Sequence, residues 1–508
     1  MENKKYKVII VGIGLAALSA AVRMIELGIK DIGIYMKSYG GTPYIAAINF
    51  VLPDNPYGDT NKQYFDDMIN AGYQIGNINL VNEMAENTMN GYNLLKRWDI
   101  EFAKNEDGTT KLRHLSGHIY PRSLCSTKDL IGVEIGKKLI NKLKENKVDI
   151  YEGYECVKVL SDSKKIYGIT VKNSEGNLEN LYSNIVVAAW GGIGNLVGVS
   201  TYPHDIKGNT LAIAKDAGAK LIDVEFIEYE PMVILSPQGA LGEPCPTAML
   251  GEGGYLINSK NERFILKVRP QGEAGASKTL LNKQIWNEVN AGNGSKNSGV
   301  WIDLRHIDRN ILKSYPWLFK RLMDNGIDPN RDIIEIGPMA HSFSGGIEVD
   351  ENYESSIEGF FAIGEACGGI HGACRCAGNA ASQAVISGLL CAQAIAKKYK
   401  DLQQTIKIFP MEYKSDKNIY EKYMPQIKEI AVKALGIYRK GEILEDAKKH
   451  IENILKNTDI QKDTETLQKI ESIYYIVKAA LNRKETRGTH IRLDYPEESK
   501  DYKKEFTI

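Results

Sequence analysis

Tyr6-Lys7-Val8-Ile9-Ile10-Val11-Gly12-Ile13-Gly14-Leu15-Ala16-Ala17 is the stretch of this 508-residue chain that decides its fold. Residues 6–11 form a short apolar run, typical of a strand buried on both faces in a parallel sheet. The run ends in a G-x-G-x-x-A turn, residues 18–27 have helical periodicity, Gly28 closes the helix, and residues 31–35 begin a second strand. This order predicts a Rossmann-like βαβ unit that binds a dinucleotide.

Each small residue of the turn has a physical role. Gly12 permits the tight turn, Gly14 lets a pyrophosphate approach the backbone, and Ala17 allows the helix to pack closely. The phosphates are then expected at the positive end of the helix. Met36 stands where many such folds place an acidic residue for the adenosine ribose, so the ribose contacts must differ. The candidate cofactor contacts in this region are Gly12, Gly14, Ala16, Ala17 and Lys37.

Composition excludes some classes of partner. Lys and Arg total 64, as do Asp and Glu, so the net charge is zero and no general field attracts nucleic acid or an anionic membrane. Hydrophobic residues make up 43% of the chain, which is ordinary for a globular protein. A chain of this length is expected to fold as two or three domains.

The expected location is the cytoplasm. The first residues run directly into an apolar strand without a signal peptide, and charges interrupt the apolar stretches before the roughly 18 residues that span a bilayer. We therefore expect no membrane insertion. The seven cysteines contain no CxxC pair, which argues against structural zinc or a cysteine-ligated cluster in the chain, and we expect no metal site. Reduced thiols fit this spacing better than disulfides.

Two further apolar strands end in glycine-rich turns, at residues 184–192 and 359–369. The region between them has few long periodic runs and is interpreted as a separate cap. Beyond about residue 405 the chain is predicted to be helical, with amphipathic blocks at 413–456 and 464–482. The predicted division is a nucleotide-binding domain at 1–229 and 339–404, a capping and substrate domain at 230–338, and a C-terminal helical domain at 405–508.

A series of ordered motifs along nearly the whole chain resembles those of one known family. They fall in Gly208–Ala219 with Asp223–Phe226, Gly251–Gly254 with Asn261–Phe264, His341–Ile347, Gly364–Arg375 and Arg483–Arg492. In this order they resemble the motifs of the FAD-dependent succinate dehydrogenase/fumarate reductase flavoproteins, with L-aspartate oxidase and adenylylsulfate reductase alpha relatives. The resemblance implies an α/β fold: a Rossmann-like FAD-binding domain with an inserted α+β capping domain and a C-terminal helical domain.

The resemblance also implies the FAD contacts. Glu365 matches the acidic residue that holds ribityl or ribose hydroxyls, and the glycine turns add Gly191 and Gly364. Asn379, Ala380 and Ala381 match the start of a helix near the flavin pyrimidine edge, where a helix N-terminus stabilises negative charge on the reduced flavin. Respiratory members attach FAD covalently to a histidine. Residues 38–46 contain no histidine, and Tyr44 is nearest to that position, so we expect non-covalent FAD.

The family transfers hydride between flavin N5 and a substrate carbon, while a positioned acid or base handles the neighbouring proton. His341 and Arg375 match two residues of the family's carboxylate clamp. Lys278 aligns with the proton-delivering arginine, with Arg269 as the alternative if the register is shifted. Lysine acts as an acid or base when burial lowers its pKa, but it cannot copy a bidentate guanidinium. Two relay positions of the family fall on Thr247 and Leu250.

These departures bear on the substrate. Glu230 stands where the family has a histidine, and it should repel a second substrate carboxylate, which disfavours plain fumarate and succinate. A substrate with one carboxylate and a cationic or neutral far end fits better. Alternatively, Glu230 pairs with Lys278 and leaves that far end apolar. Leu115 replaces the glutamate that aspartate oxidases use for the amine, which argues against aspartate.

Several alternatives stay open at this level. The chain could be the flavin subunit of a complex with a ferredoxin or another iron–sulfur partner, acting as adenylylsulfate reductases or fumarate reductases do, or less plausibly an FAD-binding subunit without catalysis. Cys374 and Cys376 could form a redox pair beside Arg375, although packing is the favoured interpretation. The sequence carries no signal for a particular oligomeric state.

Overall fold

The computed structural model describes residues 5–126 and 130–508. Its centre is a parallel sheet in the order β16-β9-β1-β2-β5. The five strands are β1 Val8–Val11, β2 Ile32–Met36, β5 Asp149–Glu152, β9 Val186–Ala188 and β16 Phe360–Ala362. The strands β1, β2, β9 and β16 are buried along their whole length, as the apolar runs in the sequence predict.

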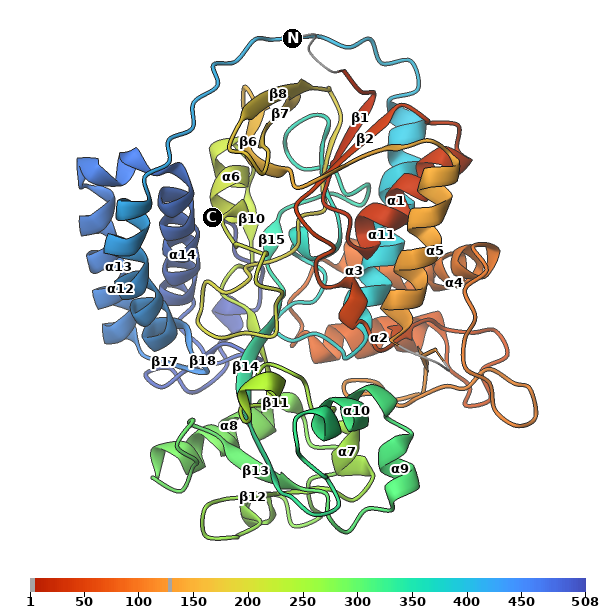
Figure 1. The fold of residues 1–508 in the computed structure, drawn as a ribbon, viewed down its shortest axis with the longest axis vertical. Coiled ribbons are helices and arrows are strands. Elements are labelled where there is room, and N and C mark those ends of the chain that lie inside the picture. The colour runs from red at the N-terminus through yellow and green to blue at the C-terminus, as the bar shows by residue number, and fades with distance from the viewer. Residues whose placement is uncertain (1–4, 127–129) are drawn as a thin grey trace.

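Helices cover one side of this sheet and a small antiparallel sheet covers the other (Figure 1). The helices are α1 Leu15–Glu26, α5 Ile131–Glu145 and α11 Asn379–Lys398, and the antiparallel strands are β6 Glu155–Ser161, β7 Ile166–Lys172 and β8 Leu178–Tyr182. Helix α1 packs closely on α11, because Gly388 has no side chain there. A Cβ atom on Gly388 would lie 2.6 Å from the carbonyl oxygen of Ala16. This contact holds α11 directly against the helix that follows the glycine turn.

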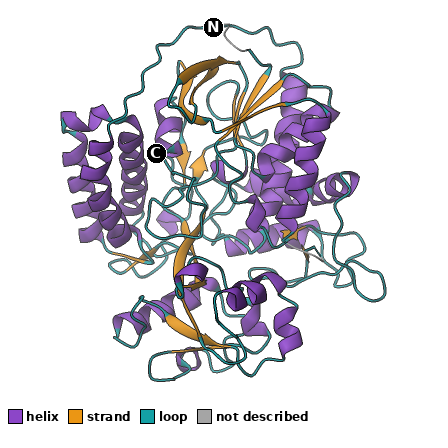
Figure 2. Ribbon diagram, viewed as in Figure 1, coloured by secondary structure: helices purple, strands orange, loops and turns teal. Residues whose placement is uncertain are grey.

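A long hairpin leads into and out of an inserted region. Strand β11, Ile227–Ile234, pairs antiparallel with β14, Ile334–Phe343, and their sheet continues as β13 Val300–Asp303 and β12 Tyr255–Ile257. The helices around it are α7 Ala248–Gly251, α8 Lys278–Asn290, α9 Arg309–Lys313 and α10 Pro316–Asp324. The inserted region has its own hydrophobic cluster and mixes helices with strands, which makes it α+β (Figure 2).

The C-terminal part contains three long helices, at the left of Figure 1: α12 Lys417–Leu435, α13 Gly441–Leu455 and α14 Thr464–Asn482. The second predicted block, 464–482, coincides with α14, but the first block is two helices. The chain leaves helical geometry at Gly436, and β17, Tyr438–Arg439, pairs with β18, Ile491–Arg492. This two-residue strand was not predicted, because the segments before and after it both have helical periodicity.

The remaining helices and strands lie outside the inserted region and the three C-terminal helices. They are α2 Asn61–Ala71, α3 Ile78–Glu86, α4 Thr88–Arg97, α6 Thr210–Asp216, β3 Ile48–Asn49, β4 Ser123–Leu124, β10 Leu221–Ile222 and β15 Gly346–Ile347. The last residues of the chain bond to β10, since the amide of Ile508 donates to the carbonyl of Leu221 at 2.8 Å.

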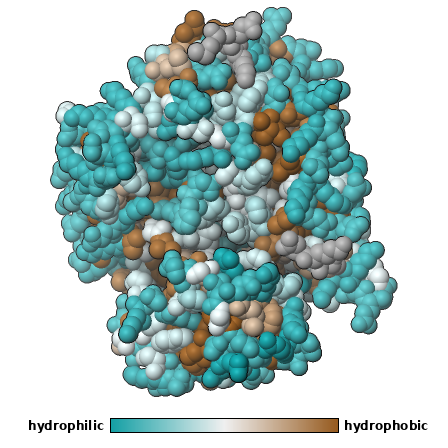
Figure 3. All heavy atoms as spheres, viewed as in Figure 1, coloured by the Kyte–Doolittle hydropathy of each residue, from teal (hydrophilic) through white to brown (hydrophobic). Residues whose placement is uncertain are grey.

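One apolar helix corrects an expectation from the sequence. Among the described residues, α11 is long and apolar enough to cross a membrane by length and composition, whereas the sequence patterns predicted no such stretch. Its apolar window is 67% buried inside the protein, as in the core helix of a globular fold. The face shown in Figure 3 is mostly hydrophilic, with hydrophobic residues in separate small patches.

Candidate functional site

The glycine turn fits a phosphate group. Gly12 has φ of +107°, and a Cβ atom there would lie 2.3 Å from the carbonyl oxygen of Ala189, so only glycine is accommodated. Beside Gly14 the space is open, because its Cβ would meet nothing nearer than the hydroxyl of Thr42 at 3.6 Å. The amide of Leu15 donates to that hydroxyl at 2.7 Å. The turn therefore leaves room for a pyrophosphate at the start of α1.

Cations gather near the end of β2. Lys37 Nζ lies 3.6 Å from a carboxylate oxygen of Glu155, and Lys207 binds the same oxygen at 2.9 Å. Burial is the largest influence on Lys37 and lowers its pKa, which the charge of Glu155 only partly offsets. Met36 itself is buried in the sheet. The position of the usual acidic residue is therefore a buried methionine, and the next residue is a cation.

Glu365 lies in the glycine-rich turn at residues 359–369, beside the turn at residues 184–192. Its carboxylate accepts hydrogen bonds from the hydroxyl of Tyr202 at 2.6 Å and from the amide of Phe343 at 3.0 Å. A Cβ atom on Gly192 would lie 2.8 Å from this carboxylate. Burial raises the pKa of Glu365, although these donors act in the opposite direction. Gly191, next to Gly192, and Gly364, next to Glu365, both have positive φ.

Four charged side chains meet at the base of the inserted region. Lys278 Nζ lies 2.6 Å from Oε2 of Glu230 and 3.0 Å from Oε1 of Glu228. Arg375 Nη2 donates to that same Oε1 of Glu228 at 2.8 Å. The side chains of Lys278, Glu228, Glu230 and Arg375 are only 12%, 2%, 8% and 5% exposed. We call these four residues the charged cluster.

The local structure explains this arrangement. Glu228 and Glu230 are two residues apart on β11, and such residues face the same side of a strand. Lys278 is the first residue of α8, which Ser277 caps by accepting a hydrogen bond from the amide of Leu280 at 3.2 Å. A cation is unfavourable at a helix N-terminus. The two glutamates therefore provide the compensation that keeps Lys278 in place.

The charge states follow from these contacts. Burial lowers the pKa of Lys278, but the charges of Glu228 and Glu230 outweigh burial and raise it above its ordinary value. The pKa of Glu228 falls to about 2, because Arg375 and Lys278 overcome the effect of burial. An acid–base role for Lys278 was expected to need a pKa that burial lowers. The structure does not show this, because the net effect raises the pKa of Lys278. At neutral pH Lys278 is an ammonium and Glu228 is a carboxylate.

His341 lies next to the charged cluster on β14. Thr201 Oγ1 is 2.8 Å from His341 Nδ1, and the amide of Thr201 donates to the carbonyl of Ala340 at 3.0 Å. Burial, followed by the charge of Lys278, lowers the pKa of His341 to about 4. The imidazole is therefore neutral at neutral pH and can donate one hydrogen bond.

Ligand atoms of His341, Glu228 and Glu230 lie within 4.8 Å of one another, a spacing compatible with a metal ion. The ammonium of Lys278 already lies between the two carboxylates, however, and Arg375 binds one of them. A divalent cation would have to displace or approach these fixed positive charges. We therefore assign no metal to this position.

Other candidates from the sequence lie apart from this cluster. Arg269 donates to the backbone carbonyl of Gly272, three residues along the chain. Thr247 precedes α7, and Leu250 is buried in the hydrophobic cluster of the inserted region. Tyr44 is 58% exposed.

Cys374 and Cys376 have no disulfide. Burial raises the pKa of Cys374 to about 12, and the charge of Glu228 adds to the effect. Burial raises the pKa of Cys376 as well. Both side chains are therefore neutral thiols at neutral pH, which agrees with packing rather than with a reactive thiolate.

Two residues of this site, Glu228 and Thr201, were not predicted from the sequence. Glu228 lies outside the motifs that carry the family resemblance, but a signal was present. Two acids separated by one residue in an otherwise apolar strand predict a pair of buried carboxylates, which need cations. No sequence pattern indicates Thr201, because it contacts His341 on β14 from a loop that lies 140 residues earlier in the chain.

Two polar atoms of the cluster remain without hydrogen-bond partners among the described residues. Oε2 of Glu228 is a buried acceptor, and Nε of Arg375 is a buried donor. Leaving such atoms unpaired costs about 1–3 kcal/mol each, and more for charged groups. The site is thus complementary to a ligand that brings one hydrogen-bond donor and one acceptor.

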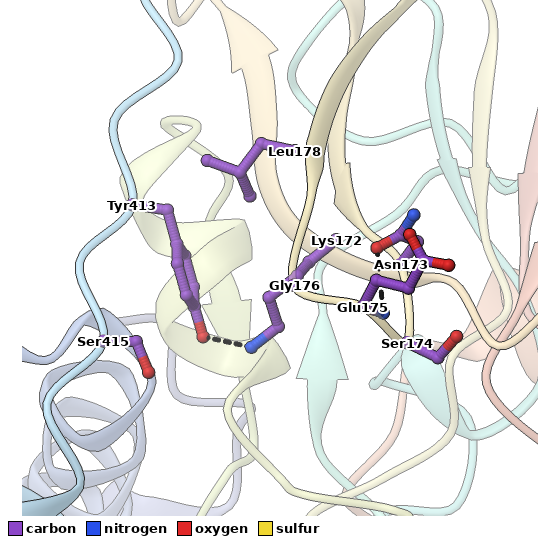
Figure 4. Close-up of a pocket in the computed structure, with 8 residues that line it drawn as sticks. All are labelled: Lys172, Asn173, Ser174, Glu175, Gly176, Leu178, Tyr413 and Ser415. Atoms are coloured by element: carbon purple, nitrogen blue, oxygen red, sulfur yellow. Dashed lines mark hydrogen bonds between the residues drawn. The ribbon is translucent and has the colours of Figure 1, made fainter.

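Surface cavities lie elsewhere. One of about 400 Å³ lies between the β7–β8 turn and the segment that leads to α12, where Lys172 Nζ is 2.6 Å from the hydroxyl of Tyr413 (Figure 4). A second of about 270 Å³ is lined by residues of β2, α5 and β5, including Met36 and Glu152. Neither is lined by a residue of the charged cluster, so we do not assign the chemistry to them.

Comparison with known proteins gives a consistent picture. The FAD binding domain family matches residues 7–381, and the fumarate reductase flavoprotein C-terminal family matches residues 425–506. An uncharacterized FAD-dependent oxidoreductase of Methanocaldococcus jannaschii is 28% identical over 98% of this chain and 95% of its own length. A fumarate reductase (CoM/CoB) subunit of Methanothermobacter marburgensis is 26% identical over 100% of this chain and 98% of its own.

A solved structure agrees in fold. The FrdA chain of E. coli quinol fumarate reductase superposes with a TM-score of 0.87, covering 98% of this chain and 93% of its own. Its sequence identity is 22%, so this similarity concerns the fold alone.

Proposed function

Because this chain belongs to the FAD-dependent succinate dehydrogenase/fumarate reductase flavoprotein family, we propose that it transfers hydride between FAD and a small substrate with a single carboxylate. The chain is an FAD-dependent oxidoreductase, and the proposal concerns its substrate. The far end of that substrate is cationic, neutral and polar, or apolar, rather than a second carboxylate. Plain fumarate and succinate are therefore not the expected substrates.

The charge balance of the cluster carries this proposal. Lys278 and Arg375 are matched by Glu228 and Glu230, and His341 is neutral. A dicarboxylate would bring two more negative charges into a buried site whose cations already bind protein carboxylates. One incoming carboxylate can use the free Nε of Arg375 and the N–H of His341. A donor at the other end can use the free Oε2 of Glu228.

The proposed roles follow from the protonation states. Reduced FAD would supply a hydride, with its two electrons, to one atom of a substrate C=C or C=N bond, and Lys278 would give a proton to the neighbouring atom. Lys278 holds the proton in the resting site, and negative charge that develops on the substrate has to draw this proton away from Glu228 and Glu230, which raise the pKa of Lys278. Arg375 and His341 hold the carboxylate and stabilise negative charge that develops beside it. Glu228 orients both cations.

We also propose that FAD binds without a covalent bond and that the protein works in the cytoplasm. Tyr44, the nearest residue to the tethering position, is not the histidine to which respiratory members attach FAD, and its side chain is largely exposed. Denaturation with acid tests the mode of cofactor binding, because free FAD would remain in the supernatant while tethered flavin would precipitate with the protein.

A second candidate keeps the chemistry but adds a partner. One relative is named as a subunit of a fumarate reductase, and the alignment covers the whole of the present chain. By this analogy the chain would receive or pass on electrons through a separate ferredoxin or iron–sulfur protein. Reduced flavin that reacts slowly with oxygen but rapidly with an added ferredoxin would support this candidate. Rapid reoxidation by oxygen alone would favour a stand-alone oxidase.

The substrate test uses four compounds of matched size. Succinate carries two carboxylates, whereas in succinamate, 4-aminobutanoate and butanoate an amide, an aminomethyl or a methyl group replaces one of them. We expect at least one of the last three, or its unsaturated counterpart, to change the visible spectrum of bound FAD, and succinate and fumarate to have no effect. A response to fumarate or succinate alone would contradict the proposal.

A further inference from the structure

Tyr229 lies on β11 between the two glutamates of the charged cluster and is bonded on two sides. Its hydroxyl donates to the carbonyl of Leu435, the last residue of α12, at 2.9 Å. Its own carbonyl accepts a hydrogen bond from Nδ2 of Asn282 on α8 at 2.8 Å. The last carbonyls of a helix have no partner within the helix, and Tyr229 satisfies one of them. Tyr229 therefore joins the C-terminal helices to the inserted region.

Asn282 and Lys278 lie on the same face of α8. They are four residues apart, a spacing that places side chains one above the other on a helix. Lys278 contacts Glu228 and Glu230, whereas Asn282 bonds the backbone of the residue between those glutamates. One hydrogen bond thus attaches α8 to the segment of β11 that holds the carboxylates. This bond fixes how far the ammonium of Lys278 lies from them.

The strand pairing is irregular at this point. Glu228 pairs with Ser342, but Tyr229 pairs with Ala340, so His341 on β14 is an extra residue. Such a bulge disrupts the ladder of hydrogen bonds locally. Strand β11 is also the outer strand of its sheet, so β14 supports it from one side. The ladder alone therefore does not fix the two glutamates, and the contact from α8 adds a constraint.

The chemistry of Asn282 points to a role as a donor. Its Nδ2 atom faces a carbonyl oxygen, which can only accept, so the group at this position is the NH₂. The Oδ1 atom is buried and has no hydrogen-bond partner among the described residues. An unpaired acceptor is unfavourable, and an apolar side chain would avoid it. Packing alone therefore does not explain an asparagine here, whereas the bond to Tyr229 does.

We propose that Asn282 and Tyr229 are positioning residues for proton transfer, because they hold α8 and β11 at the spacing at which Lys278 contacts both glutamates. The inference rests on the proposed function, in which Lys278 gives the proton. Asn282 acts directly on α8, and the hydroxyl of Tyr229 holds the strand from the side of α12. Loss of the amide lets the first turn of α8 move away from the strand, which weakens both contacts of Lys278.

The first test is the chemical reactivity of Lys278, which needs no substrate. Purified holoprotein is treated with acetic anhydride at several pH values, and mass spectrometry gives the acetylation rate of Lys278. In the unmodified protein this rate should be low, because the ammonium is largely buried and binds two carboxylates that raise its pKa. Asn282→Leu should raise the rate roughly tenfold, as for loss of one hydrogen bond, and shift its pH dependence to lower pH.

The second test is turnover. The substrate is the compound among succinamate, 4-aminobutanoate and butanoate that changes the FAD spectrum of the unmodified protein. In Asn282→Leu we expect kcat to fall roughly tenfold while KM changes less, because Arg375 and His341 still hold the carboxylate. The alkaline limit of kcat should move to lower pH, since Lys278 loses its proton more readily. A general loss of structure would lower kcat at every pH without moving this limit.

Two further variants complete the design. Tyr229→Phe removes the bond to Leu435 and keeps the backbone contact, so it should raise the acetylation rate of Lys278 only roughly two- to threefold. Asn290→Ala, at the exposed last position of α8, is the matched control and should behave as the unmodified protein. Circular dichroism and FAD content confirm that each variant is folded and loaded.

An acetylation rate of Lys278 that stays the same in Asn282→Leu would overturn the positioning role, whatever the substrate. A higher rate with unchanged kcat and pH profile would show that Asn282 positions Lys278 but that Lys278 does not give the proton, so the proposed function would fail instead. An unchanged rate in Tyr229→Phe would remove Tyr229 from the proposal. A higher rate in Asn290→Ala as well would indicate a general loosening of α8 and overturn the proposal.

Discussion

Lys278 Nζ lies 2.6 Å from Oε2 of Glu230, so the residue aligned with the family's proton donor is bound to the carboxylate that replaces a family histidine. Lys278 begins α8 in the inserted region, whereas Glu230 lies on the strand that enters it. Without Lys278 the buried carboxylate of Glu230 would have no cation beside it, at a cost of several kcal/mol. Together the two residues form a pair, which explains how both departures from the family pattern coexist in one site.

Replacing Lys278 by alanine should abolish most turnover and leave FAD bound. If Lys278 gives the proton, kcat should fall roughly 100- to 10,000-fold, the usual contribution of a general acid. Because the change leaves Glu228 and Glu230 without their shared cation, circular dichroism and FAD content should be measured alongside the rate. Lys278→Arg keeps the charge and serves as the comparison. Full activity in the alanine variant would assign the proton to another group.

Glu228→Gln should widen the substrate range toward dicarboxylates. The change removes one negative charge and frees Arg375 for a substrate carboxylate, while Lys278 stays paired with Glu230. We expect binding of succinate to improve roughly tenfold or more, which corresponds to about 1.4 kcal/mol. Binding is measured from the visible spectrum of FAD.

Glu262→Gln, at an exposed position of the inserted region, should leave succinate binding unchanged. Equal affinities in all three proteins would remove Glu228 from substrate selection.

Gly14→Val should produce a folded protein without FAD. The Cβ of residue 14 has open space in the protein itself, so valine should be tolerated by the backbone. The same space is needed for the pyrophosphate. We expect normal circular dichroism, loss of the yellow colour and no recovery on adding FAD. A yellow Gly14→Val protein would show that the pyrophosphate lies elsewhere.

Much of the fold follows from local sequence patterns. The apolar runs ending in glycine turns predicted β1, β9 and β16, because strands buried on both faces are continuously hydrophobic. The periodicity of residues 464–482 predicted α14 as well. Strand β17 was missed because two residues carry no periodicity, and its pairing with β18 depends on contacts about fifty residues away in the chain.

The candidate site was only partly accessible from the sequence. Lys278, Glu230, His341 and Arg375 could be named from their motif positions, but their charge states could not. Burial lowers the pKa of Lys278, but the direction of the net shift depends on the charges within a few ångströms, of which Glu228 has the largest effect. The distances between these charges are set by the packing of α8 on strands β11 and β14, and no single motif encodes that packing.

The stability of the protein should fall as pH rises from about 5 to 8 because of Glu471 on α14. Burial, with a contribution from Asp216 on α6, raises its pKa from 4.5 to about 7. Between pH 4.5 and 7 the folded state thus holds a proton that the unfolded state has lost, which stabilises the fold. This stabilisation is lost as the pH rises through 7. Glu471→Gln should gain about 1 kcal/mol at pH 8, after allowing for solvent screening, and nothing at pH 5. Glu429→Gln, at an exposed position of α12, should show no pH-dependent gain in urea unfolding.

The contact between Thr201 and His341 predicts a pattern in substrate affinity. His341 has a pKa of about 4, so it binds a carboxylate as a neutral imidazole, and the tautomer must place the hydrogen on the nitrogen facing the substrate. The Thr201 hydroxyl, 2.8 Å from Nδ1, can donate to that atom and so leave the hydrogen on Nε2.

Replacing Thr201 by valine keeps the shape of the side chain and removes this donor, so KM should rise roughly three- to tenfold with a smaller change in kcat. Thr201→Ser should restore the KM, since it keeps the hydroxyl. Because the imidazole is neutral throughout, KM of the unmodified enzyme should stay level between pH 5.5 and 8. A KM that rises steeply above pH 6 would instead require a charged histidine in the clamp. An unchanged KM in Thr201→Val, beside a large effect of His341→Ala, would show that the histidine binds substrate without this partner.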